Sequence, residues 1–258
     1  MNTIKFLGTA GARFVVSKQL RASGGIWITL KDTQVLVDPG PGSLVRCLAS
    51  RPKLNPMELD GIILTHRHID HSNDINIMIE AMTNGGFAKR GTVFAPRDAL
   101  EDDPVILHYV RDHVENIEIL QEKKTYTVGN ISFTTPIRHI HGVETYGVNI
   151  SGNNSTISLI ADSKYFEGLE SYYPGDILII NVVLSKEWKE IQHLCLDDVE
   201  KILENNKPTL CVLTHFGMTV IKQKPWEIAE KLAKKFGIQV LAARDGMSID
   251  IDHYLKKN

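Results

Sequence analysis

The segment from Gly61 to His71 constrains this chain more than any other. Residues Gly61–Thr65 form a continuous apolar run, typical of a strand buried on both faces. Four side chains that can bind metal follow it within six residues: His66, His68, Asp70 and His71. Because an uncompensated polar cluster is costly to bury after such a strand, the pattern indicates a shared ligand.

The spacing of these side chains predicts how they are presented. In an extended segment every second residue points to the same side, so we expect His66, His68 and Asp70 on one side. His71 is then expected to turn in as a helix begins. Imidazole and carboxylate groups together suit Zn²⁺, Mn²⁺ or Fe²⁺. The segment therefore predicts a metal centre.

The rest of the chain alternates short apolar runs with helical patterns. With 258 residues, 43% of them hydrophobic, it predicts one α/β or α+β domain spanning residues 1–258. Helices are predicted at 43–50, from a Ser72 cap through Met82 to the turn at 84–86, at 104–114, at 196–204 and at 225–236. In addition to Gly61–Thr65, a short strand is predicted near Val93. Further strands are predicted at Ile4–Leu7, Ile26–Leu30, Gln34–Asp38, Ile131–Thr135, Gly147–Ile150, Ile157–Ala161, Ile177–Asn181 and Leu210–Thr214.

Composition narrows the class of protein. The net charge is −2 with no basic arm, so a nucleic acid is a disfavoured partner, though not an excluded one. No apolar run reaches the ~18 residues of a membrane span, and the N-terminus lacks the pattern of a signal peptide. The cysteines Cys47, Cys195 and Cys211 are isolated in apolar stretches. We therefore expect a cytoplasmic protein without membrane contact, and the sequence does not indicate its oligomeric state.

The motif THRHIDH matches the HxHxDH signature of the metallo-β-lactamase superfamily. The rest of the chain resembles that superfamily's branch of ribonuclease Z-like and phosphonate-pathway cyclic phosphodiesterase-like proteins. The segments that carry this resemblance are FLGTAG (6–11), VLVDPGPG (35–42), IRHIHGVETYG (137–147), LIADSKY (159–165), VLTHFG (212–217) and the triplet 245–247.

The resemblance implies a four-layer αβ/βα sandwich with two divalent metal ions at one edge. Zn²⁺ is the expected ion, with Mn²⁺ or Fe²⁺ as alternatives. By resemblance, one ion takes His66, His68 and His141. The other takes Asp70, His71 and His215, and Asp162 bridges the two.

Such a centre favours hydrolysis of a small anionic substrate. Two cations can share a hydroxide at neutral pH and neutralise charge in the transition state. The leading hypothesis is a phosphodiesterase for a small or nucleotide-like phosphodiester. Alternatives are a tRNA 3′-processing endonuclease of the ribonuclease Z type, a thioester or lactone hydrolase, and a non-catalytic binding protein on the same fold. The short interval from His141 to Asp162 leaves no room for the long arm that ribonuclease Z family members use to grip tRNA.

Several further residues have expected roles. Asp38 is expected to orient a metal-bound histidine. His139 shares a strand face with His141, and the spacing to Tyr146-Gly147 favours His141 as the ligand, which leaves His139 as a neighbour. The expected catalytic residues are Asp70 and His193, the latter as a proton donor or phosphate contact. No helix is predicted after the glycines of residues 8–11. We expect these glycines to let the backbone approach the metal site closely or to form a tight turn.

Overall fold

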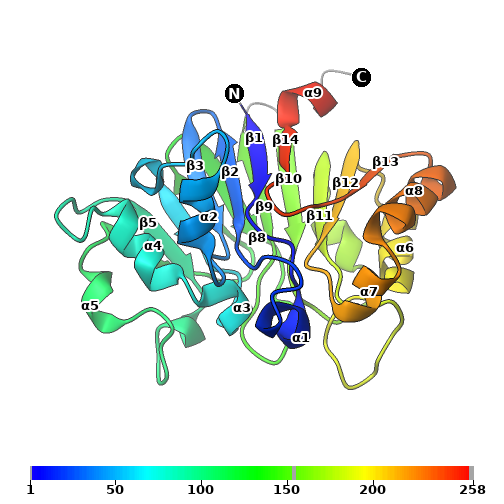
Figure 1. Ribbon diagram of the computed structural model, residues 1–258, viewed down its shortest axis with the longest axis horizontal. Helices are drawn as coiled ribbons and strands as arrows, with labels where there is room; N and C mark the ends of the chain where they lie inside the picture. Colours follow the sequence, from blue (N-terminus) through cyan, green and yellow to red (C-terminus); the bar gives the residue numbers. More distant parts are fainter. Residues whose placement is uncertain (1, 153–154, 256–258) are drawn as a thin grey trace.

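Two seven-stranded sheets form the centre of the protein (Figure 1). The computed structural model describes residues 2–152 and 155–255. The first sheet has the order β14-β1-β2-β3-β4-β5-β6 and the second β13-β12-β11-β10-β9-β8-β7. The strands are β1 Thr3–Phe6, β2 Ile26–Leu30, β3 Thr33–Val37, β4 Gly61–Ile63, β5 Thr92–Ala95, β6 Asn116–Ile119, β7 Lys124–Val128, β8 Ile131–Thr135, β9 Val148–Gly152, β10 Ser155–Ile160, β11 Ile177–Asn181, β12 Leu210–Thr214, β13 Gln239–Ala242 and β14 Ser248–Asp250.

Helices cover the outer face of each sheet, which gives the expected four layers (Figure 1). On the first sheet these are α2 (Ser43–Ala49), α4 (Ile75–Met82) and α5 (His108–Arg111), and on the second α6 (Leu196–Asn205) and α8 (Pro225–Phe236). The short helices α1 (Ala12–Ser17) and α3 (Ile69–Ser72) pack together at the edge between the sheets. The remaining helices are α7 (Met218–Lys222) and α9 (Ile251–Leu255).

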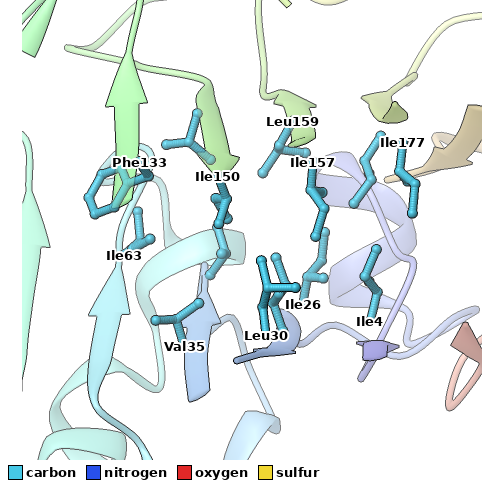
Figure 2. Packing of buried hydrophobic residues seen from close by; sticks show 14 of the residues in the cluster. Ile4, Ile26, Leu30, Val35, Ile63, Phe133, Ile150, Ile157, Leu159 and Ile177 are labelled. Carbon is cyan, nitrogen blue, oxygen red and sulfur yellow. The ribbon is translucent and has the colours of Figure 1, made fainter. Parts of the chain in front are cut away.

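The strand sequences explain why both faces of each sheet are covered. In β11, Ile177 and Ile179 face the opposite sheet, whereas Leu178 and Ile180 face the helices α6 and α8. All four side chains are fully buried, so this apolar strand has no polar face. Figure 2 shows the layer between the sheets, where Ile177, Ile157 and Leu159 lie opposite side chains of the first sheet.

The direction of the strands determines where the functional residues gather. Within the first sheet β3, β4 and β5 are parallel, and within the second β10, β11 and β12 are parallel. Strand β1 runs parallel to β3, because β2 lies between them and is antiparallel to both. In the same way β8 runs parallel to β10, with β9 antiparallel between them. The carboxyl ends of parallel strands meet at one edge, where loops can bring their side chains together.

Most predicted elements are confirmed within one or two residues, but two of the predicted helices differ from those observed. Ser72 does not cap a long helix; it ends α3, and α4 begins separately after Asp74. The predicted helix over 104–114 is a single turn, because Pro104–Leu107 runs irregularly before α5. The sequence Gly152-Asn153-Asn154 predicts a turn between two strands, and residues 153 and 154 lie outside the described residues. Within the ranges 2–152 and 155–255, no helix combines the length and apolar character needed to cross a membrane.

Replacing a side chain between the sheets should destabilise the protein strongly. Ile179→Ala removes buried methyl and methylene groups from the apolar layer between the two sheets. It should lower the free energy of unfolding by about 2–5 kcal/mol. Val45→Ala, on the exposed side of α2, should change it by less than about 0.5 kcal/mol. Urea denaturation of both variants measures this difference. Equal losses would show that the inter-sheet layer is not the main core.

Candidate metal centre

Asp38 and Thr65 connect the ends of two neighbouring parallel strands. Asp38 directly follows β3 and has φ 55°, a conformation that turns the chain away from the sheet. Its Oδ1 accepts a hydrogen bond from the Thr65 backbone N–H at 2.7 Å, and its Oδ2 accepts one from the Thr65 hydroxyl at 2.8 Å. Sequence reasoning missed Thr65, whose contact with Asp38 depends on the register of β3 against β4.

The same two residues orient two histidines. His71 Nδ1 lies 2.9 Å from Asp38 Oδ2, and His66 Nδ1 lies 3.1 Å from the Thr65 hydroxyl. With Nδ1 of each ring engaged, both Nε2 atoms are free to face the centre. The contact expected between Asp38 and a histidine of the cluster is thus present.

Asp162 lies where the two sheets meet. It follows β10 and is 2% exposed, and Asn181 Nδ2 at the end of β11 donates to its Oδ1 at 2.9 Å. Its carboxylate oxygens lie 3.9 Å from His66 Nε2, 3.4 Å from His71 Nε2 and 3.4 Å from His215 Nδ1. One carboxylate therefore contacts histidines carried by both sheets, and Asn181 is a second residue that sequence reasoning missed.

The candidate ligands fall into two groups of three. His66, His68 and His141 place one ring nitrogen each within 4.8 Å of one another, and so do the ligand atoms of Asp70, His71 and His215. The structure thus brings together the two sets that the family resemblance implies. Asp70 lies in α3 rather than on an extended segment, because the helix already begins at Ile69.

The ring nitrogens of this cluster fit a divalent cation. His66 Nε2, His71 Nε2 and both ring nitrogens of His215 are buried without a hydrogen-bond partner among the described residues. Each buried polar atom left unpaired costs about 1–3 kcal/mol. Several such nitrogens beside two carboxylates match the mixed nitrogen and oxygen ligands of Zn²⁺, Mn²⁺ and Fe²⁺.

The charges of the centre suit a bound cation. Burial lowers the pKa of His66 well below its ordinary value, so its ring is neutral. Burial also opposes a charge on His71, but the carboxylates of Asp162, Asp38 and Asp70 outweigh it and hold that pKa well above the ordinary value. The pKa of Asp162 is well below its usual range, because His215, His193 and His71 outweigh its burial. The excess of ionised carboxylates would stabilise a cation just as it stabilises a proton on His71.

His141, and not His139, enters the cluster. His141 Nδ1 donates to the Gln192 carbonyl at 2.9 Å, and its Nε2 lies 3.0 Å from His68 Nδ1. Both nitrogens of His139 are engaged elsewhere, by the Asp162 carbonyl and by Tyr173. His141, the histidine that the spacing to Tyr146-Gly147 favours as the ligand, is therefore the one that faces the centre.

His193 reaches the centre from the loop before α6. Its Nδ1 lies 3.4 Å from Asp162 Oδ2, and its ring is 5.0 Å from that of His141. Burial lowers its pKa to about 4. Together with His141 and Asp162 it also forms a further group of possible ligand atoms. The geometry thus allows contact with a substrate or with a metal ion.

The glycine segment 8–11 packs directly against the centre. A Cβ on Gly11 would collide with the backbone carbonyl of His215, so a side chain there would displace this histidine. The expectation of close backbone approach is confirmed. The expectation that no helix follows is wrong, because α1 begins at Ala12.

Sequence similarity to other proteins extends along most of the chain. Over 257 residues it is 28% identical to an uncharacterised protein of Methanocaldococcus jannaschii, covering 96% of this chain and 94% of that protein. It is 29% identical over 209 residues to the probable metallo-hydrolase YhfI of Bacillus subtilis, covering 76% and 82%. With ribonuclease Z of Thermoplasma volcanium it shares 28% identity over 137 residues, covering 52% of this chain and 43% of that enzyme.

Solved structures have the same fold. The crystal structure of Bacillus subtilis YhfI matches with a TM-score of 0.79 and 21% identity, covering 96% of this chain and 98% of that one. A diphosphatase of the PhnP family matches with a TM-score of 0.70 and 20% identity, covering 96% of each chain. Residues 33–216 match the family model of the beta-lactamase superfamily domain. The chain belongs to this family and is a metal-binding hydrolase of the metallo-β-lactamase fold.

Proposed function

We propose that this protein is a dinuclear, metal-dependent phosphodiesterase acting on a small organic phosphodiester, including nucleotide-like ones. The observation that carries the proposal is the pair of three-residue groups that share Asp162. Two cations held side by side can contact both the attacking and the leaving oxygen of an in-line displacement at phosphorus. The likeness to ribonuclease Z and to a PhnP-family diphosphatase supports phosphate-ester chemistry.

The residues have distinct proposed roles. His66, His68 and His141 would hold one ion, Asp70, His71 and His215 the other, and Asp162 would bridge them. Bound divalent ions, with Zn²⁺ the expected species, would supply Lewis acidity and lower the pKa of water. Asp70 would also be catalytic, because its side chain is 15% exposed against 2% for Asp162 and can meet an incoming substrate.

Exposed apolar side chains around the centre support an organic substrate. Ile69 lies between His68 and Asp70 and is 68% exposed, while Ile140 precedes His141. Phe14 lies on α1, which packs against α3, and is also exposed. Exposed Trp188 lies on the loop that ends at His193. Apolar groups beside a cationic centre suit an anionic ester with an aryl or nucleobase substituent.

The alternatives have weaker support. For tRNA processing, the part of the chain between His141 and Asp162 that the structure describes is mainly the strands β9 and β10, which supply no gripping arm. A thioester releases a thiolate that barely needs a partner, whereas His193, 3.4 Å from Asp162, is placed to contact the leaving oxygen or the phosphate of a diester. A lactone also releases an alkoxide, but the likeness to ribonuclease Z and to a PhnP-family diphosphatase favours attack at phosphorus. A non-catalytic binding protein would not need the complete set of ligands. We propose the cytoplasm as the site of action.

Asp162→Ala should remove most of both metal ions, because both groups lose their shared carboxylate. Elemental analysis of the purified variant measures metal per chain against an expected value of about two for the wild type. Asp60→Ala, at a carboxylate outside the centre, is the control and should keep both ions. Full metal content in Asp162→Ala would show that Asp162 does not bridge.

His193→Ala should lower kcat by roughly 10²–10⁴ for a diester with a poor leaving group while metal content stays unchanged. With a nitrophenyl leaving group, which barely needs a proton, the loss should be much smaller if His193 is a proton donor. Steady-state kinetics on both esters measure the ratio. Similar losses on both would assign His193 to phosphate contact, and loss of metal would make it a ligand.

The metal-loaded protein should hydrolyse p-nitrophenyl phenyl phosphate faster than p-nitrophenyl phosphate, a thioester, a lactone or precursor tRNA. Trp188→Ala should raise KM for the phenyl diester several-fold and leave KM for p-nitrophenyl methyl phosphate unchanged, since the methyl diester lacks the second aromatic ring that would contact the indole. Trp226→Ala, at an exposed tryptophan on α8, should change neither. Preference for the thioester or for precursor tRNA would replace the proposed function.

A further inference from the structure

A buried histidine and tyrosine lie behind the metal centre and contact it through the backbone. His139 is 4% exposed and Tyr173, next to the short 3₁₀ helix at Leu169–Tyr172, is fully buried. His139 Nε2 lies 2.6 Å from the Tyr173 hydroxyl. His139 Nδ1 lies 3.2 Å from the backbone carbonyl of Asp162. One imidazole therefore joins Tyr173 to the backbone of the residue that both ligand groups share.

The direction of these hydrogen bonds follows from the chemistry of the partners. A carbonyl oxygen only accepts, so His139 Nδ1 carries the proton. The ring is buried and its two partners are a carbonyl and a hydroxyl, so it is neutral and its Nε2 accepts. The Tyr173 hydroxyl then donates to this nitrogen, since a neutral phenol carries its own proton.

Packing leaves the pair little freedom. A Cβ on Gly147 would lie 2.5 Å from the Tyr173 hydroxyl, so a glycine is needed for the ring to occupy this place. The Tyr173 ring packs among the apolar side chains between the second sheet and its helices. The carboxylate of Asp162 is held separately, by Asn181 Nδ2 at 2.9 Å. The backbone and the side chain of Asp162 are thus fixed by different partners.

We propose that Tyr173 and His139 are positioning residues that hold the backbone of Asp162, so that its carboxylate reaches both ligand groups. Without the tyrosine hydroxyl, His139 Nε2 would be buried without a partner and the ring could turn or change tautomer. The hydrogen bond to the Asp162 carbonyl would then weaken, and the shared carboxylate would move relative to the histidines. This inference rests on the proposed metal centre but not on the identity of the substrate.

The test is the affinity of the metal-free full chain for Co²⁺, measured by competition with a chelator, together with the Co²⁺ absorption spectrum. Tyr173→Phe removes the hydroxyl and keeps the ring. It should weaken Co²⁺ binding by roughly 10–100-fold, the usual effect of losing a group that orients a ligand, and alter the spectrum. His139→Asn can still donate from Nδ2 to the Asp162 carbonyl, so it should bind Co²⁺ more tightly than His139→Ala.

Tyr126→Phe is the matched control. Tyr126 is a buried tyrosine whose hydroxyl donates to the Ile119 carbonyl at 2.9 Å, outside the metal centre. Thermal denaturation of the metal-free variants should show a loss of stability for both phenylalanine substitutions, whereas only Tyr173→Phe should lose Co²⁺ affinity. Unchanged affinity and spectrum in Tyr173→Phe, an equal loss in Tyr126→Phe, or no Co²⁺ binding by the wild type would each overturn the inference. Failure to cleave phosphodiesters while Co²⁺ still binds would overturn only the proposed substrate.

Discussion

The carboxylate of Asp162, among histidines from both sheets, is the contact on which the centre depends. It lies within 3.9 Å of His66 and His71, which follow β4, and within 3.4 Å of His215, which follows β12. These contacts require the two sheets to face each other in one register, which the apolar layer between them fixes. The geometry of the site therefore depends on the packing of the core, because a shift between the sheets would separate the two ligand groups.

The surroundings of the centre hold each ligand from its outer side. Asp38 and Thr65 engage Nδ1 of His71 and His66, and the Gln192 carbonyl engages Nδ1 of His141. The ring nitrogens that remain point inward, and several have no partner among the described residues. An array of this kind loses little entropy when a cation binds, because its side chains are already oriented.

Much of the fold and of the centre could be predicted from the sequence. Strands such as β11 are apolar on both faces, and the ligand motif follows one of them, so local pattern and global position agree. Thr65, Asn181 and Tyr173 could not be found this way, since their contacts depend on the register between strands far apart in sequence. The helix predicted over 104–114 was wrong because Asn76 of α4 binds the Val105 carbonyl and the Leu107 N–H, which engages backbone groups that a helix would use. The assignment of residues 1–258 to one domain stays a prediction.

Anomalous diffraction from crystals of the protein grown with Zn²⁺, recorded on both sides of the zinc edge, tests most directly whether two metal ions share the Asp162 carboxylate. We expect two strong peaks, one beside His66, His68 and His141 and the other beside Asp70, His71 and His215, with the Asp162 carboxylate between them. A single peak in one group, with Asp162 turned away from it, would contradict a shared centre. So would zinc bound only elsewhere on the protein.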